Sequence, residues 1–169
     1  FDVESACKVT YEEEGTRIVA GYTSRPNAPY GFYNRGLTLK EGGSSAWHMM
    51  TFKIDSRYLE HTLTRDQVIE DRHYHKAAEL LDHVAEELLP ERLFELLEEA
   101  ALEDGERYDD LATILYHFAM HFPSAARKHA DRHVVRLKGR EPIPLKGAFY
   151  AARDDRLYAS RGADHLFEA

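Results

Sequence analysis

The stretch "YLEHTLTRDQVIED" (residues 58–71) lies where the sequence pattern changes from sheet to helix, and it decides the fold. Just before it, "AWHMMTFKID" (residues 46–55) has the character of a strand. After Arg65, apolar residues recur at steps of three and four along one helical face for about five to six turns: Tyr74, Ala77, Leu81, Val84 and Leu88. The change of period predicts an α+β fold, with Arg65 at the junction between sheet and helix.

The start of that helix is predicted at Thr64, whose hydroxyl is a suitable N-cap. Asp66, Glu70 and Asp71 would then place negative charge in the first turns, where the helix dipole favours it. Judged by residue type alone, Arg65 is a solvated cation that pairs with Asp66 or Glu70.

The first third of the chain predicts sheet. "CKVTYEEEGTRIVAGYT" (residues 7–23) contains two runs of β-forming residues around a Glu-Gly turn. A further strand-like run begins with "GLTL" (residues 36–39), and the strand is expected to stop at Gly42-Gly43. Proline and glycine interrupt this region too often for a helix.

The rest of the chain predicts helices and then a small mixed region. Pro90 is expected to break or restart the long helix. A third helix is predicted over residues 107–122, ending before Pro123, with an apolar face of Leu111, Ile114, Leu115 and Phe118. The other predicted segments are a helix at 91–101, a partly helical stretch at 124–137, a linker at 139–147, a short buried strand at 148–152, and a short helix with a tail at 154–169.

The bulk composition limits the classes of partner. The 169 residues carry a net charge of -8, which disfavours nucleic acid and anionic membranes as partners. No stretch approaches the roughly 20 apolar residues of a membrane span. The single cysteine, Cys7, allows no internal disulfide and suits a cytoplasmic location. Because the chain begins at Phe1 without an initiator methionine or a signal-peptide pattern, we expect a piece of a longer protein.

The residues alone indicate no catalytic or metal centre. The ten histidines include two pairs spaced four apart, His117 with His121 and His129 with His133. Ala130 follows His129 where the zincin motif needs a glutamate, so we expect no bound metal. Neither a nucleophile elbow nor a phosphate-binding glycine loop is present.

Two segments carry a resemblance to a known family. "FYNRGLTLKEGG" (residues 32–43) and "MTFKIDSRYLEHTLTRDQVIED" (residues 50–71) resemble the middle segment of the ninety-kilodalton heat-shock chaperones, which include bacterial HtpG. The matching elements are Asn34-Arg35, then Asp55-Ser56, and then Leu63-Thr64-Arg65-Asp66, with the family's spacing from Asp55 to Arg65. The likeness is strong over residues 31–71 and loose beyond residue 100.

The sequence also departs from the family pattern. The family usually has Ser and Glu at the positions of Thr64 and Asp66, Pro and Asn at those of Glu60 and Thr62, and often a glutamine at that of Ile69. The role of that glutamine is therefore not carried over to this chain.

The resemblance implies a specific architecture. Residues 1–104 are expected to form a β-α-β two-layer sandwich with the left-handed crossover of GHKL ATPase middle domains. Residues 105–131 would be a helical connector and residues 132–169 a small α/β unit. The longer protein would be a homodimer with an N-terminal GHKL domain that binds ATP and Mg²⁺.

The resemblance also implies a function, which is to couple ATP hydrolysis to the binding of unfolded client proteins. Arg65 would reach the ATP γ-phosphate in that N-terminal domain, while this chain alone would bind no nucleotide. Asn34, Arg35, Thr64 and Asp66 would support Arg65 or contact clients.

Two other functions stay open. One is the transducer domain of another GHKL ATPase, of the mismatch-repair or topoisomerase type. Those domains reach the phosphate with a lysine and present basic surface to DNA, which the net charge of -8 disfavours. The other is an acidic interaction domain with no link to ATP.

Overall fold

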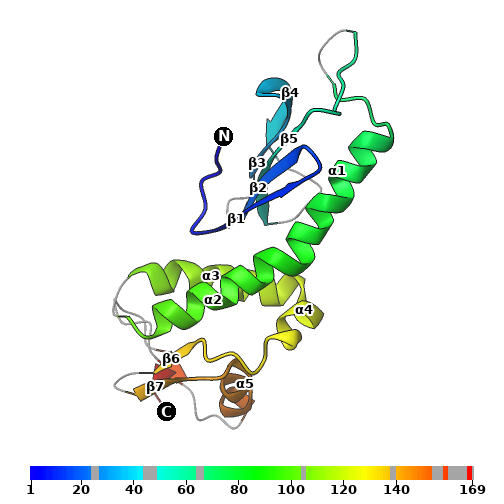
Figure 1. Ribbon diagram of the computed structural model, residues 1–169. Coiled ribbons are helices and arrows are strands. Elements are labelled where there is room, and N and C mark those ends of the chain that lie inside the picture. The colour runs from blue at the N-terminus through cyan, green and yellow to red at the C-terminus, as the bar shows by residue number, and fades with distance from the viewer. Residues whose placement is uncertain are drawn as a thin grey trace. The chain divides into compact units, whose positions relative to one another are not determined.

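The computed structural model describes residues 1–23, 27–43, 49–63, 67–103, 106–137, 140–153, 158–159 and 167–168. It confirms an α+β fold with a five-stranded mixed sheet and several helices (Figure 1). The chain divides into two compact units, Phe1–Arg92 and Leu93–Ala169. No helix among the described residues is both long and apolar enough to cross a membrane.

The sheet of the first unit has the strand order β1-β2-β5-β3-β4. Its strands are β1 (Cys7–Glu13), β2 (Thr16–Tyr22), β3 (Pro29–Asn34), β4 (Leu37–Gly43) and β5 (Met50–Ser56). The pairing of β3 with β5 is parallel, and the other pairings are antiparallel. The predicted strands and the Glu-Gly turn are thus confirmed.

Two tight turns join neighbouring strands at one end of this sheet. Both residues of each turn, Glu14-Gly15 and Arg35-Gly36, have positive φ, as two-residue type I′ hairpin loops require. Because Thr16 pairs with Ser56 and Tyr33 with Asp55, strand β5 leaves the sheet at this same end.

Helical structure covers one face of the sheet. The helical segments that cover it are α1 (Arg72–His83) and the π-helical segment η1 (Val84–Leu88), and α2 (Leu89–Ala101) follows in the chain and continues into the second unit. Tyr74 of α1 lies against Phe32 with ring centroids 5.5 Å apart, and His83 lies against Tyr11. Beneath the helix, the largest fully buried strand side chains are Ile18, Met50, Phe52 and Ile54. This face of the sheet holds the core of the first unit.

The predicted N-cap Thr64 is wrong, because helix α1 begins seven residues later than that choice implies, at Arg72. Its N-cap is Asp71, whose carboxylate accepts hydrogen bonds from the backbone amides of His73 and Tyr74 at 2.9 and 3.0 Å. The residues just before Asp71 belong to a loop whose two arms are hydrogen-bonded to each other, since the Ile69 amide donates to the Glu60 carbonyl. Strand-like pairing therefore competes successfully with helix formation here.

Of the break or restart predicted at Pro90, the break does not occur, whereas a new α-helical segment, α2, does begin at Leu89. The helix continues through Pro90 because a π-turn precedes the proline, in which the Leu89 amide donates to the carbonyl of Val84 five residues back. Proline has no amide hydrogen to donate, and it clashes with the carbonyl four residues earlier in a regular helix. A wider turn at that point relieves the conflict.

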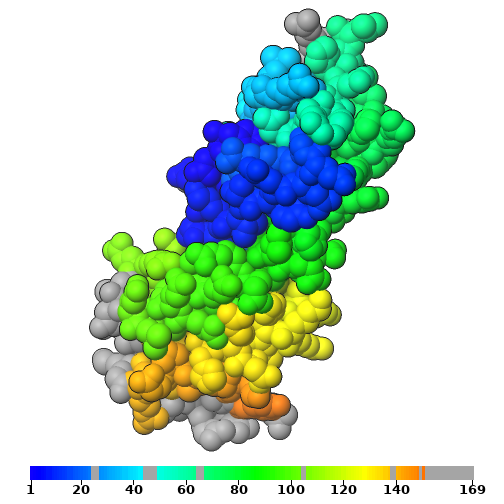
Figure 2. Space-filling model, viewed as in Figure 1, coloured from blue at the N-terminus to red at the C-terminus, as the bar shows by residue number. Residues whose placement is uncertain are grey.

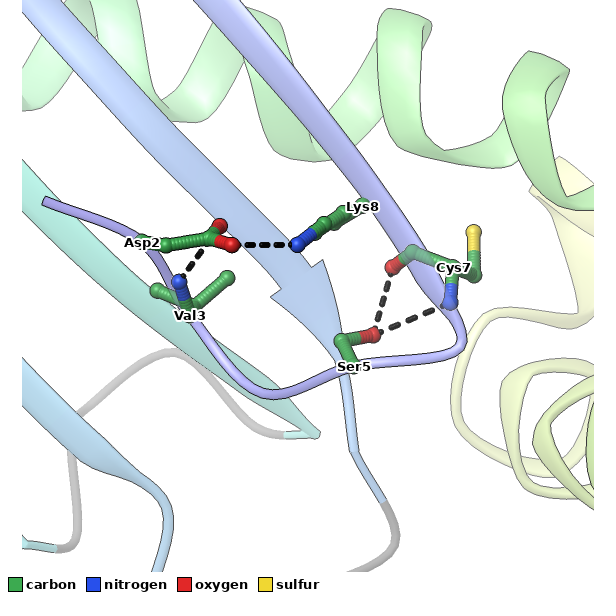
Figure 3. Close-up of polar contacts among 5 residues, drawn as sticks. All are labelled: Asp2, Val3, Ser5, Cys7 and Lys8. Carbon is green, nitrogen blue, oxygen red and sulfur yellow. Dashed lines mark hydrogen bonds and ion pairs between the residues drawn. The ribbon is translucent and has the colours of Figure 1, made fainter.

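The N-terminal residues 1–6 lie on the opposite face of the sheet (Figures 2 and 3). Ser5 Oγ lies 2.6 Å from the Tyr22 carbonyl oxygen and 2.7 Å from that of Cys7, and it accepts from the Cys7 amide at 3.1 Å. Gly21 permits this close approach, because a Cβ there would lie 2.5 Å from Ser5 Cβ. Asp2 pairs with Lys8 at 2.6 Å, and this ion pair lowers the pKa of the Asp2 carboxyl group.

The second unit combines helices with a small sheet of order β7-β6-β9-β8. Its elements after α2 are α3 (Glu106–His121), α4 (Pro123–Lys128), β6 (Val135–Leu137), β7 (Arg140–Ile143), α5 (Leu145–Arg153), β8 (Tyr158–Ala159) and β9 (Phe167–Glu168). The predicted apolar face of the third helix is buried, which confirms that prediction. Tyr108 donates to the Val134 carbonyl at 2.9 Å, and the Arg136 guanidinium stacks on the Tyr108 ring.

Two predictions for the C-terminal part of the chain are wrong, and a third, the short helix with a tail at residues 154–169, falls largely outside the described residues. The expected strand at residues 148–152 is part of helix α5, and the expected linker contains strand β7 and the start of that helix. The described parts of the last sixteen residues are strands and not a helix. A short apolar run rich in alanine fits a helix or a buried strand equally well on its pattern, and alanine favours the helix.

Candidate functional site

The candidate site is built at the end of the sheet where the β3–β4 turn meets the exit of β5. The Asn34 side-chain amide donates to the Leu59 carbonyl at 2.7 Å. The backbone amide of Gly36 donates to the Asp55 carboxylate at 3.0 Å. These bonds join two sequence motifs that lie about twenty residues apart. Arg35 is exposed at the turn with φ 50°, so it contributes a solvent-facing cation.

The exit of β5 is also bonded to the β1–β2 turn. Ser56 Oγ lies 2.8 Å from the Thr16 hydroxyl in a buried contact. The Arg57 amide donates to the Gly15 carbonyl at 3.3 Å. Both turns at this end of the sheet therefore hold the segment that follows β5.

A paired loop then projects beyond the strands, between β5 and α1 (Figure 1). Its two arms are linked by the amide of Thr62 donating to the Gln67 carbonyl, and that of Ile69 to the Glu60 carbonyl, each at 2.9 Å. At its base Leu59 is fully buried and Val68 is 8% exposed, whereas Leu63 near its tip is fully exposed. The loop is thus anchored by apolar burial at one end and open to solvent at the other.

The three central residues of the family-like motif, Thr64, Arg65 and Asp66, lie outside the described residues. They follow Leu63 and precede Gln67, the two ends of the described arms. Ile69, which stands where the family often has glutamine, is 39% exposed. Asn34 and Arg35 are therefore the predicted site residues that the structure describes, and Asn34 lies at the base of this loop.

The sequence reasoning missed a row of side chains beside the loop, three of them exposed and the fourth, His73, half-buried. Arg57 lies with its Cζ 4.8 Å above the centre of the Tyr58 ring. The Tyr58 ring stacks on that of His73, with centroids 5.3 Å apart and an interplanar angle of 12°. Arg72 Nε lies 3.3 Å from His73 Nε2. We call Arg57, Tyr58, His73 and Arg72 the arginine row. Its sequence signal is two arginine–ring dipeptides that flank the motif, but nothing local to either predicts their stacking.

Two acidic residues near the row, Glu14 and Asp71, are already hydrogen-bonded. Lys76 forms an ion pair with Glu14, and that hydrogen bond lowers the pKa of the Glu14 carboxyl group. The backbone amide of Tyr74, and then that of His73, lower the pKa of Asp71. Both carboxylates stay ionised at neutral pH and are hydrogen-bonded to groups other than the two guanidinium groups, although the charge of Arg72 also helps to lower the pKa of Asp71.

A separate pocket of about 470 Å³ lies on the face of the sheet that the N-terminal residues border. Its volume suits a small molecule. Its charged lining is Asp2, Glu4, Glu41 and Lys53. Tyr33 donates to Glu41 there, and burial together with this bond raises the pKa of the Tyr33 phenol. A pocket with three carboxylates and one lysine disfavours a phosphate ligand.

The other candidate chemistries find little support in the described part of the chain. No group of three or more metal-ligating side chains occurs among those residues. Burial raises the pKa of the Cys7 thiol to about 12, so Cys7 is not a nucleophile at neutral pH.

No protein-family model matches the chain, and no curated protein matches it either.

Proposed function

We propose that this chain is the middle segment of an HtpG-like ATP-dependent chaperone, in which Arg65 reaches the γ-phosphate of ATP bound to an N-terminal GHKL domain. The left-handed β-α-β crossover of such middle segments, the homodimer, the client proteins and a cytoplasmic location are parts of this proposal. ATP and Mg²⁺ would be bound by the N-terminal domain.

The observation that carries the proposal is the convergence of separate motif elements at one end of the sheet. Asn34 bonds to Leu59 at the base of the loop, and Asp55 bonds to the neighbouring turn. The arms of the loop then pair with each other on either side of residues 64–66. Elements that the resemblance drew from distant positions thus contribute to one anchored loop.

An anchored loop suits an arginine that acts across a domain junction. A guanidinium placed against a transferring phosphoryl group stabilises the charge that develops there, and it does so best when its backbone is held in place beforehand. Hydrolysis would then require closure of the N-terminal domain on this loop. Asn34 would position the loop, and Arg35, Thr64 and Asp66 are proposed to support Arg65 or to contact clients.

The central test uses the full-length protein with Arg65→Ala. We expect the ATPase rate to fall by about 10²-fold or more, while ATP affinity and the circular dichroism of this segment stay unchanged. Arg127→Ala is the matched control, because Arg127 is an exposed arginine of α4 in the second unit. Unchanged turnover in Arg65→Ala would overturn the proposed role.

A second test uses residues 1–169 alone, which we expect to bind no ATP in isothermal titration calorimetry. Micromolar nucleotide binding by this chain would contradict a coupling segment. Salt-dependent binding of duplex DNA would instead favour the transducer domain of another GHKL ATPase.

A further inference from the structure

The arginine row is unusual because neither of its two guanidinium groups, of Arg57 and Arg72, forms an ion pair among the residues that the structure describes, although the charge of Arg72 acts on the neighbouring Asp71. Both are exposed. The chain carries 30 acidic against 22 basic residues, so carboxylates are abundant, yet Glu14 and Asp71 are hydrogen-bonded to Lys76 and to backbone amides. The row is a cationic surface on an acidic protein.

The row is also pre-organised. Arg57 stacks on Tyr58 and donates to its hydroxyl, Tyr58 stacks on His73, and Arg72 Nε bonds to His73. The two ends of the row come from the exit of β5 and the first turn of α1. Each guanidinium has five N–H donors, and one from each is used within the row. Side chains held in this way lose less conformational entropy when a ligand binds.

The stacking excludes one class of partner. A single-stranded nucleic acid binds by placing its bases on free aromatic faces. Arg57 covers one ring face of Tyr58, and His73 is stacked against that ring as well. With a net charge of -8 over the whole chain, a nucleic acid would also be repelled at longer range.

The row is separate from the pocket described above. The pocket of about 470 Å³ is lined by residues of the other sheet face and contains no member of the row. An exposed row at the surface suits an extended chain more than a compact ligand. Carboxylates are the groups that guanidinium forks bind in bidentate geometry.

We propose that the arginine row docks an acidic polypeptide segment of a partner protein, whose carboxylates pair with Arg57 and Arg72. Tyr58 and His73 hold the two guanidinium groups in place. This proposal does not depend on ATP or on Arg65. It assigns a protein-binding role to side chains that lie beside the loop and outside the family-like motif.

The test is fluorescence anisotropy with a labelled decaglutamate peptide and residues 1–169, at low and at physiological salt. We expect saturable binding that weakens by at least about tenfold in Arg57→Glu/Arg72→Glu and weakens less in Arg57→Gln/Arg72→Gln. Arg127→Glu, an exposed arginine of α4, should leave the affinity unchanged. The three substituted side chains lie at the surface, and circular dichroism checks that each variant is folded.

Each alternative result overturns the proposal. No binding of decaglutamate by the unmodified chain, or equal binding of decaglutamine, would show that the row is not an acidic-peptide surface. Equal loss in Arg127→Glu would show an effect of net charge alone. Competition by millimolar inorganic phosphate would indicate a simple anion site, and tighter binding of a single-stranded oligonucleotide would indicate a nucleic-acid surface.

Discussion

The two faces of the first sheet are covered in different ways. On one face, α1 and η1 lie over fully buried side chains such as Phe52 and Ile54. On the other, residues 1–6 are held by the hydroxyl of Ser5 and the ion pair of Asp2 with Lys8 (Figure 3). Burial of apolar area is strong and non-directional, whereas single polar contacts are weak and directional. The packing of α1 and η1 on the sheet should therefore contribute most to the free energy of unfolding. The contacts of residues 1–6 should mainly determine how well ordered that segment is.

The largest expected effect comes from the helix-covered face. Phe52→Ala removes a fully buried ring that contacts both Tyr30 and Phe32, and we expect a loss of about 3–5 kcal/mol in the free energy of unfolding. Phe1→Ala is the matched change on the other face. Phe1 contacts Tyr33 but is 46% exposed, so its loss should cost less than about 1 kcal/mol.

Urea denaturation followed by circular dichroism measures both variants. Similar losses in Phe52→Ala and Phe1→Ala would show that the two covers are energetically equivalent, which would contradict the comparison.

A smaller effect is expected at Ser5. Its hydroxyl has one proton for two nearby carbonyl oxygens, of Tyr22 and Cys7, and it accepts from the Cys7 amide. Ser5→Ala should lower the free energy of unfolding by about 1 kcal/mol and speed hydrogen exchange within residues 1–6. Ser124→Ala, an exposed serine of α4, is the control. Unchanged exchange in Ser5→Ala would show that the segment is held by other contacts.

The same contrast explains which parts of the fold the sequence predicts. The strands of the first unit are flanked by turns whose residue types predict their conformation. An example is Glu14-Gly15, which has positive φ at both positions. Residues 148–152 carry no such signal. A short apolar run with alanines is compatible with a helix or a strand, and the strand was predicted. The start of α1 was misplaced because Thr64 and Asp71 are both good caps, and only the pairing of residues 60 and 69 decides between them.

The candidate site likewise has one part that is a local sequence pattern and one part that depends on the fold. The motif around Arg65 is a local pattern and can be recognised in the sequence, and the structure places Asn34 at the base of its loop. The arginine row depends on stacking between Tyr58 and His73, which are brought together by the loop that separates them. No local pattern encodes such a contact.

The smallest effect that we predict concerns the charge of Asp71 at the start of the helical cover. Hydrogen bonds from the amides of Tyr74 and His73 lower the pKa of this carboxyl group in the folded protein. A folded-state pKa below the unfolded value of about 3.9 stabilises the fold above that pH, and this contribution disappears as the pH falls through the folded-state pKa. Asp71→Asn keeps an acceptor for both amides but removes the charge that favours the helix N-terminus. We therefore expect Asp71→Asn to have a slightly lower melting temperature than the unmodified chain at pH 6, and the same melting temperature at a pH low enough to protonate Asp71.

Two further variants serve as controls. Asp71→Ala should be less stable than Asp71→Asn at both pH values, because it also removes the acceptor. Thr64→Ala should change neither the helix content nor its pH dependence, since α1 begins at Arg72. A loss of helix in Thr64→Ala, or a difference between Asp71→Asn and the unmodified chain that does not vary with pH, would contradict the assignment of Asp71 as the charged N-cap.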